Sequence, residues 1–351
     1  MSKFRIGYFG FVPHPMFLET CAKDPALEVV HIPLEVSTGE AVQALSSCHG
    51  YYVMAARDEL PVPLHVHGEL LGKLPNLLMA ASYGAGYDPC NPEDCTEAGV
   101  LLVNQAGGNA EGVAEHAVGM MLACLKRMPE AHAAMIAGTA RNRATLLGRE
   151  LRGRTVGLVG CGHVGKRVAE IVKAAFGCRV IACDPYLDAA TIADRGAEKV
   201  DMATLLAEAD VVSVHCPLTP GTRGMINAEA YAAMRKGVVF VTTASGSIHD
   251  EDALLAALES GQVASAGLDV WEVEPPPVNH PLLHHRAVIA SQHTAGVTQE
   301  SRANITKIAA LAFSDLAAGR MPPRIVNPEV KERFSARYAA AFGAPPREVP
   351  A

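Results

Sequence analysis

The residues with the clearest chemical potential form a glycine-rich stretch near the middle of the 351-residue chain. A G-x-G-x-x-G pattern follows the apolar residues 155–159 and precedes a helical pattern over residues 166–176. Glycines at this spacing allow a tight turn, close approach of the backbone to a pyrophosphate, and close packing of helix on strand. Because the helix N-terminus also offers free N–H groups to phosphate, the stretch predicts a dinucleotide site. The contacts predicted here are Gly160, Gly162, His163, Val164 and Gly165.

An acidic residue follows the next apolar run at the spacing that such a site requires. Asp184 comes directly after residues 179–183 and lies 19 residues beyond Gly165. At the tip of the second strand its carboxylate can accept both ribose hydroxyls of NAD, and it would repel the 2′-phosphate of NADP. Residues 185–188 contain no arginine that could bind this phosphate. The sequence therefore predicts NAD as the cofactor.

Strand and helix patterns alternate on both sides of a long helical segment, residues 111–127. Such alternation is typical of parallel sheets whose crossovers are helices, so we predict two α/β units. A further helical pattern covers residues 299–316, and the tail, residues 331–351, has helical and proline-rich parts. The predicted strands span residues 3–9, 50–55, 77–81 and 100–104 in the first unit, and 155–159, 179–183, 211–215, 238–242, 264–268 and 288–290 in the second.

The composition excludes several kinds of partner. A net charge of −7 gives no basic footprint for nucleic acid or for an anionic membrane. No apolar run reaches the roughly 18 residues of a membrane span. The nine cysteines are scattered and odd in number, which favours reduced thiols in the cytoplasm. The pairs His65 with His67 and His284 with His285 lack convincing acidic or thiolate company, so we expect no metal site.

Four later segments carry further motifs. They are H-C-P-L-T at residues 215–219, T-T-A-S-G-S-I-H-D-E at 242–251, A-G-L-D-V-W-E-V-E-P at 266–275 and S-Q-H-T-A-G at 291–296. Together with the glycine loop, Y-G-A-G-Y-D at residues 83–88 and V-A-E-H-A at residues 113–117, they give the chain its family likeness. Over about residues 50–315 the chain resembles the D-isomer-specific 2-hydroxyacid dehydrogenases.

The resemblance implies an NAD(H)-dependent oxidoreductase. Such an enzyme transfers a hydride between the nicotinamide and a small 2-hydroxy acid, 2-oxo acid or related carbonyl substrate. By the same resemblance His293 is the acid/base and Glu274 its carboxylate partner. A histidine can shuttle a proton near neutral pH, and a nearby carboxylate holds its ring and favours its charged form.

The resemblance also implies roles for residues in the other loops. Asp269 is expected to face the nicotinamide carboxamide, with a loop cap after a buried strand as the alternative. The backbone of residues 83–86 is expected to receive a substrate carboxylate, with a structural glycine turn as the alternative. The implied dinucleotide contacts are Cys216, Pro217, Thr243, Ala244, Ser245, Asp269, His293, Ala295 and Gly296, and the implied substrate contacts are Tyr83, Gly84, Ala85 and Gly86.

The expected architecture follows from the same family. It comprises two Rossmann-like, doubly wound parallel-sheet domains, with the NAD-binding domain, residues 106–296, inserted into the substrate domain. That substrate domain combines residues 1–105 with residues 297–351. The family also pairs as homodimers through the helix that matches residues 111–127, although the apolar stripe of this helix could equally be internal core.

One departure concerns the substrate anchor. The family pattern ordinarily reads Asn-Thr-Ala-Arg-Gly where this chain reads Thr-Thr-Ala-Ser-Gly, so Ser245 replaces an arginine that grips the substrate carboxylate. Serine is short and neutral, whereas guanidinium is a charged fork of donors. Gln292 also replaces the proline that usually precedes the catalytic histidine.

Two explanations follow. In the first, the chain is an active enzyme that uses another arginine or neutral donors for its substrate. In the second, it is an NAD(H)-binding sensor or corepressor-like protein with impaired turnover. Retention of both His293 and Glu274 favours the enzyme, because a sensor has no evident need for this pair. The candidate replacements are Arg57, Arg141 and Arg143 among arginines, and Ser245, Thr242 and Gln292 among neutral donors.

Overall fold

The computed structural model describes residues 3–54, 59–139 and 142–348. It divides into two compact units, each with its own sheet. Unit 1 comprises Met1–Asn109 and Thr298–Ala351, and unit 2 comprises Ala110–Val297. The boundaries expected after residues 105 and 296 lie four residues and one residue from these.

The described part of unit 1 holds a five-stranded parallel sheet in the order β2-β1-β3-β4-β5. One of its strands, β2, was not predicted from the sequence. It lies at the sheet edge, and the middle of its LEVVHI segment is partly exposed. It therefore lacks the continuous apolar run of a parallel strand that is buried on both faces. The strands are β1 (Phe4–Phe9), β2 (Leu27–Ile32), β3 (Gly50–Val53), β4 (Met79–Ser82) and β5 (Leu101–Val103).

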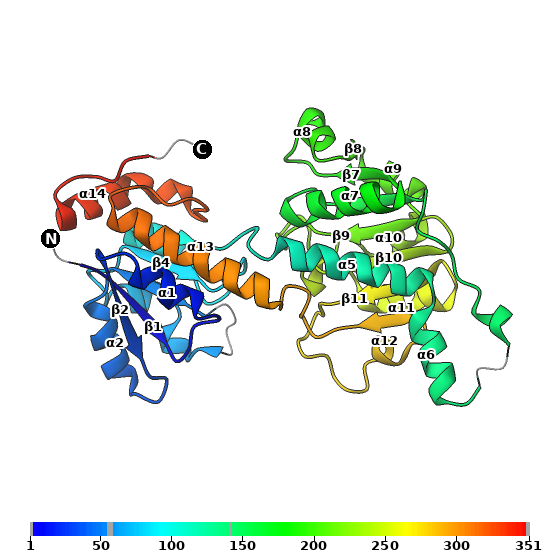
Figure 1. Cartoon of the computed structure of the whole chain (residues 1–351), viewed down its shortest axis with the longest axis horizontal. Helices are drawn as coiled ribbons and strands as arrows, with labels where there is room; N and C mark the ends of the chain where they lie inside the picture. The colour runs from blue at the N-terminus through cyan, green and yellow to red at the C-terminus, as the bar shows by residue number, and fades with distance from the viewer. Residues whose placement is uncertain (1–2, 55–58, 140–141, 349–351) are drawn as a thin grey trace. The chain divides into compact units, whose positions relative to one another are not determined.

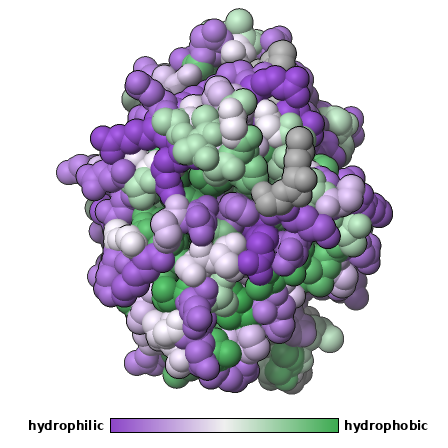
Figure 2. All heavy atoms as spheres, turned by 90° about the vertical axis from the view of Figure 1, so that its left-hand side faces the viewer, coloured by the Kyte–Doolittle hydropathy of each residue, from purple (hydrophilic) through white to green (hydrophobic). Residues whose placement is uncertain are grey.

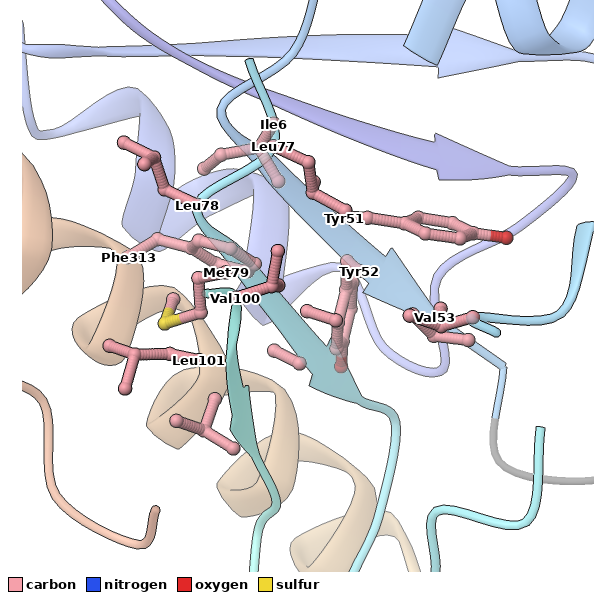
Figure 3. Close-up of a cluster of buried hydrophobic side chains, with 14 of the residues drawn as sticks. Ile6, Tyr51, Tyr52, Val53, Leu77, Leu78, Met79, Val100, Leu101 and Phe313 are labelled. Atoms are coloured by element: carbon pink, nitrogen blue, oxygen red, sulfur yellow. The ribbon is translucent and has the colours of Figure 1, made fainter. Parts of the chain in front are cut away.

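The C-terminal segment of the chain completes the core of unit 1. The helix α13 (Gln299–Ala317) packs beside α1 (Met16–Ala22), as Figure 1 shows, and inserts the fully buried Phe313 among strand residues. Figure 3 shows Phe313 beside Met79 and Leu78, close to the aromatic ring of Tyr52. The other helices of unit 1 are α2 (Thr38–Ser46), α3 (Gly68–Leu71), α4 (Pro92–Ala98) and α14 (Lys331–Phe342).

The described part of unit 2 holds a seven-stranded parallel sheet in the order β12-β11-β10-β9-β6-β7-β8. All six strands expected there are present, and the structure adds the edge strand β8. Its two residues are charged and exposed, so it carries no apolar signal. The strands are β6 (Thr155–Val159), β7 (Arg179–Cys183), β8 (Glu198–Lys199), β9 (Val211–Val214), β10 (Val238–Thr242), β11 (Val263–Leu268) and β12 (Val288–Ala290).

Helices cover both faces of this second sheet, so the prediction of two Rossmann-like α/β domains is confirmed (Figure 1). On one face lie α5 (Ala110–Leu125) and α7 (His163–Phe176), with buried residues in a common cluster. The opposite cluster takes residues from α9 (Met202–Glu208), α10 (Ala228–Ala233), α11 (Glu251–Glu259) and α12 (Pro281–His284). The long helix expected over residues 111–127 ends at Leu125, and after Arg127 the chain continues as α6 (Met128–Ile136). A short helix, α8 (Ala189–Asp194), follows β7.

Polar and apolar residues are interspersed on the surface that Figure 2 shows. Within the described ranges, no helix is both long enough and apolar enough to cross a membrane.

A buried histidine in unit 2 makes stability depend on pH. His249 is 3% exposed, and its Nδ1 lies 3.2 Å from the hydroxyl of Tyr231. Burial lowers the pKa of His249 from 6.5 to about 4. The unfolded chain binds a proton at higher pH than the folded chain does. Acid therefore favours unfolding, and stability falls as the pH is lowered from about 6.5 towards about 4.

We predict that His249→Gln makes the free energy of unfolding less sensitive to acid. This group contributes a loss of at most about 3 kcal/mol between neutral pH and pH 4, and the amide removes that loss because it does not titrate. Urea unfolding at about pH 7 and about pH 4.5 measures the difference. The exposed His132→Gln is the control and should leave the pH dependence unchanged. Equal acid sensitivity in His249→Gln and the parent protein would contradict the prediction.

Candidate active site

The candidate residues of unit 2 converge because every strand of its sheet is parallel. The strand order reverses direction between β6 and β9, and the glycine loop follows β6 at this point. Ligands of open parallel sheets bind outside the carboxyl ends of the strands at such a reversal. The predicted dinucleotide contacts all lie in the loops after β6, β7, β9, β10, β11 and β12 or in the first turn of α7, at the same carboxyl edge.

The glycine loop has the geometry that a bound pyrophosphate requires. Gly160 has φ +92°, and a Cβ on Gly165 would stand 2.3 Å from the carbonyl oxygen of Gly160. Side chains at both positions are therefore excluded by the backbone. A Cβ on Gly162 would meet no atom within 4 Å, so the space beside the loop is open. No side chain caps α7, whose first residues are His163 and Val164, and its N-terminal N–H groups face this space.

Asp184 lies where the ribose of a dinucleotide is expected, directly after β7. One carboxylate oxygen accepts the N–H of Cys161 at 3.0 Å, and the other accepts the N–H of Tyr186 at 3.0 Å. The acidic group thus fixes the glycine loop and still has free lone pairs. Arg195, at the end of α8, donates to the carbonyl of Cys161 at 2.5 Å. The guanidinium of Arg195 therefore lies at the glycine loop, although the residues next to Asp184 in the sequence include no arginine.

The loops after β9 and β10 are joined through His215. Its Nε2 lies 2.9 Å from the hydroxyl of Ser213, and its Nδ1 lies 3.4 Å from the hydroxyl of Thr243. Burial lowers the pKa of His215 to about 4, so its ring is neutral near pH 7. Burial also raises the pKa of Cys216 to about 11 and that of the Cys161 thiol, so neither cysteine is an activated nucleophile. The predicted contact Pro217 is exposed and accepts a hydrogen bond from Thr222.

Ser245 is exposed at the end of this loop, next to Ala244. In the described residues its hydroxyl has no hydrogen-bond partner, so it is available to a ligand. The following Gly246 is pressed against the backbone of Trp271, since a Cβ there would lie 2.0 Å from the Trp271 carbonyl carbon. This contact fixes the Ser245 loop next to the segment that carries Glu274.

His293 and Glu274 form a direct pair. The His293 Nδ1 lies 2.8 Å from the Glu274 Oε2, and 64% of the His293 side chain is exposed. Because the carboxylate accepts from Nδ1, the Nε2 atom is left to face a reacting group. The backbone of His293 has φ +48°, a left-handed conformation that is uncommon for residues other than glycine. The predicted contacts Ala295 and Gly296 follow in the same turn, which comprises residues 291–296 and is called the histidine turn below.

Asp269 is buried against the histidine turn. It is 1% exposed, and its carboxylate accepts the N–H groups of Thr294 at 2.8 Å and Ala295 at 3.0 Å. It also accepts the hydroxyl of Ser291 at 2.5 Å. These bonds favour the alternative of a loop cap after a buried strand, and contact with a nicotinamide stays a prediction.

In unit 1 the expected substrate loop follows β4. Tyr83 is buried, and its N–H is already bonded to the carbonyl of Val53 at 2.8 Å, so this residue offers no backbone donor. Among the described residues, Gly84, Ala85 and Gly86 donate no N–H bond to the protein. Their carbonyls are partly fixed, because Ala85 accepts from Asn104 at 2.9 Å. The free donors of this loop are therefore at 84–86.

The structure distinguishes among the residues that were considered as a replacement anchor for the substrate. Thr242 is buried and its hydroxyl lies against the backbone of Ala244, so it is not a free donor. Gln292 is exposed in the histidine turn. Arg143 lies in a short 3₁₀ turn, Arg143–Leu146, whose neighbour Arg149 bonds the carbonyl of Gly237 before β10. This is the amino edge of the sheet, opposite the candidate site. Arg57 and Arg141 lie outside the described residues.

Metal ligation has no candidate among the residues that the structure describes, since no three His, Cys, Asp or Glu side chains form a group that could hold an ion.

Comparison with known proteins identifies the family. Residues 118–295 match the model of the D-isomer specific 2-hydroxyacid dehydrogenase, NAD binding domain. The chain is 37% identical over 268 residues to glyoxylate reductase of Aeropyrum pernix, which covers 75% of this chain and 80% of that protein. The chain belongs to the D-isomer specific 2-hydroxyacid dehydrogenase family. Unit 2 is accordingly its NAD binding domain, and NAD is its cofactor.

The chain is also similar to two further proteins of known name. It is 35% identical over 297 residues to D-3-phosphoglycerate dehydrogenase of Archaeoglobus fulgidus, covering 84% of this chain and 55% of that protein. The chain thus spans about half the length of the phosphoglycerate dehydrogenases it matches. The solved glyoxylate reductase of Paecilomyes thermophila is similar with a TM-score of 0.81 and 27% identity, covering 94% of this chain and 99% of that one.

Sequence reasoning missed two features of this candidate site. Arg195 is 11 residues beyond Asp184, outside the segment in which a phosphate-binding arginine was sought. Ser291 was treated only as part of a motif, although it bonds both Asp269 and His116. The V-A-E-H-A motif contains His116, but no local pattern shows which residue that side chain meets.

We predict that Asp184→Asn narrows the preference for NADH over NADPH by about tenfold. The amide oxygen can still accept the N–H of Cys161, but the charge that repels a 2′-phosphate is gone, and Arg195 is nearby. Fluorescence titration with both cofactors measures the change. Asp194→Asn, an equal charge change at the exposed end of α8, is the control. Tighter binding of NADPH than of NADH by the parent protein would disprove the role of Asp184.

Proposed function

We propose that this chain is an NAD(H)-dependent dehydrogenase that interconverts a small 2-hydroxy acid and the corresponding 2-oxo acid or related carbonyl compound. The observation that carries the proposal is the pairing of an exposed His293 with Glu274 at 2.8 Å, on the edge that holds the glycine loop. The relatives named phosphoglycerate dehydrogenase and glyoxylate reductase support the same class of reaction.

The residues of this chain divide the reaction into binding and proton transfer. NADH, when bound, supplies a hydride to the carbonyl carbon of the substrate. His293 supplies the proton to the carbonyl oxygen from Nε2, so that one hydride and one proton give the alcohol, and it accepts this proton in the reverse direction. Glu274 holds the ring through Nδ1 and stabilises the positive charge that His293 carries before it donates.

Unit 1 is proposed to supply the substrate-binding surface. The free N–H groups at residues 84–86 are suited to a carboxylate, since backbone donors bind anions without a cationic side chain. In unit 2, the exposed Ser245 and Gln292 are neutral donors on the edge that carries His293. If these donors hold the substrate, they replace the arginine of the family pattern, and Arg57 and Arg141, which lie outside the described residues, stay the alternative anchors.

The alternative of a sensor without turnover is not favoured, because the named relatives are enzymes and the acid–base pair is assembled. Location in the cytoplasm and formation of a homodimer stay predictions. The buried residues of α5 pack within its own unit, which supports internal core as the role of that face. Apolar side chains that could pair with a second copy instead follow it, at Met128, Met135 and Ile136 of α6.

A screen of 2-oxo acids and neutral ketones, followed by NADH absorbance, tests the proposed function. Turnover of at least one compound supports the dehydrogenase. Tight NADH binding without turnover across the panel would favour the sensor.

We predict that His293→Ala lowers turnover by about 10²–10⁴, the usual scale of general acid–base catalysis. NADH affinity should change little, because the glycine loop and Asp184 are untouched. Glu274→Gln should displace the pH optimum, since it removes the charge beside the ring. Near-normal turnover in His293→Ala would remove this residue from the mechanism, and an unmoved pH profile in Glu274→Gln would contradict their pairing.

We predict that Ser245→Arg raises activity on pyruvate, glyoxylate and hydroxypyruvate if neutral donors hold the natural substrate. The guanidinium would provide a bidentate grip on the carboxylate and a positive charge near the carbonyl oxygen. It should also impair the natural reaction by filling its space. Steady-state kinetics on the three acids measure this, with Ser247→Arg two residues away as the control. High parent activity that falls in Ser245→Arg would show that another arginine already serves as the anchor.

A further inference from the structure

The histidine turn is held by a serine that bonds two groups at once. The hydroxyl of Ser291 lies 2.5 Å from the Asp269 Oδ1 and 2.9 Å from the Nε2 of His116. A hydroxyl has one hydrogen, and the carboxylate can only accept. Ser291 therefore donates to Asp269 and accepts from His116. This arrangement fixes the proton of His116 on Nε2.

Asp269 also holds the backbone of the acid–base residue, His293. Its carboxylate accepts the N–H groups of Thr294 and Ala295, and its main-chain carbonyl accepts that of His293 at 2.6 Å. Three consecutive N–H groups are thus bound to a single residue. They hold His293 in the left-handed conformation at φ +48°, which is strained for a residue other than glycine unless its surroundings stabilise it.

A second set of bonds leads from Ser291 to Glu274. The indole Nε1 of Trp271 donates to the carbonyl of Ser291 at 3.1 Å, and the Trp271 N–H donates to the Glu274 Oε1 at 3.1 Å. The other carboxylate oxygen of Glu274 bonds His293. The hydrogen bonds therefore form a closed ring through Ser291, Asp269, His293, Glu274 and Trp271.

His116 is the one member of this network that comes from a helix. It lies in the second turn of α5, which packs tightly on β11, since a Cβ on Gly267 would lie 2.7 Å from the Met120 Cβ. Asp269 follows this strand directly. The imidazole thus connects a rigid helix to a turn whose own backbone is strained.

We propose that His116 is a positioning residue for His293, acting through Ser291 and Asp269. The inference rests on the proposed function of His293 as acid/base. His116 itself does not touch the reacting atoms. Its Nε2–H bond holds the Ser291 hydroxyl on Asp269, so that the turn presents His293 to Glu274 at 2.8 Å.

The charged and titratable groups around this network are few in the described residues. His116 lies 3.7 Å from the Asp269 Oδ1, and Glu274 contacts His293 directly. Behind Trp271, Glu251 accepts the N–H of Glu272 at 2.9 Å and lies 3.1 Å from the Nε2 of His280. These are therefore the groups whose titration contributes to the pH profile of a His116 variant.

The test compares two variants of this position. In His116→Leu the donor is lost, and kcat should fall about tenfold, the equivalent of one lost hydrogen bond. The pH profile should move in the same direction as in Glu274→Gln, because the His293–Glu274 contact loosens. In His116→Gln the amide N–H can still reach Ser291, and both properties should stay near those of the parent protein. His132→Leu, at an exposed position of α6, is the control.

Two further measurements separate this inference from the proposed function. NMR titration of the His293 ring in cofactor-free protein should shift in His116→Leu and in Ser291→Ala, and it needs no turnover. In a His293→Ala background, His116→Leu should cause no additional loss of kcat, because it acts through the missing ring. Lower thermal stability with an unmoved His293 titration, or an additive loss of kcat, would overturn the positioning role. Full activity of His293→Ala would overturn the proposed function alone, since the NMR result stands by itself.

Discussion

The candidate site depends on a carboxylate that is almost completely buried. An ionised group removed from water is costly unless hydrogen bonds and opposite charge compensate it. Asp269 meets this requirement with two backbone N–H groups and the hydroxyl of Ser291, all from the histidine turn. If the turn moved away, Asp269 would be left buried without these donors, and this cost stabilises the conformation of the turn that carries His293.

The parallel topology explains why this one residue affects so much of the edge. Loops after parallel strands emerge on the same side, so the Asp269, Ser245 and Asp184 segments come from β11, β10 and β7 to one edge. Backbone contacts then fix neighbouring loops against each other. Gly246 touches the backbone of Trp271, and Asp184 holds the N–H of Cys161. The edge is therefore preorganised by the fold, and side chains such as Ser245 can vary without dismantling it.

The sequence predicts the parts of this structure that depend on local pattern. The six principal strands of unit 2 were placed correctly because each is a short apolar run. The glycine loop and Asp184 were placed with them, since they directly follow β6 and β7. The edge strands β2 and β8 were missed, since edge positions need no continuous apolar run. Side-chain direction and long-range contact were not predictable either. Only the structure shows that Thr242 turns inward and that Arg195 reaches the glycine loop.

Three histidines of unit 2 illustrate how the surroundings select an acid–base group. Burial lowers the pKa of His215 and of His249 to about 4, so both rings are neutral hydrogen-bonding groups near pH 7 and lack the second proton of an imidazolium ion. His293 is exposed and has a carboxylate 2.8 Å from one nitrogen, so its ring is held by Glu274 and is open to a ligand. Any of the three could have matched a motif, because the residue type is the same. What separates them is solvation, and a strained, exposed turn held by a buried aspartate is one way to keep a histidine both fixed in place and in contact with water.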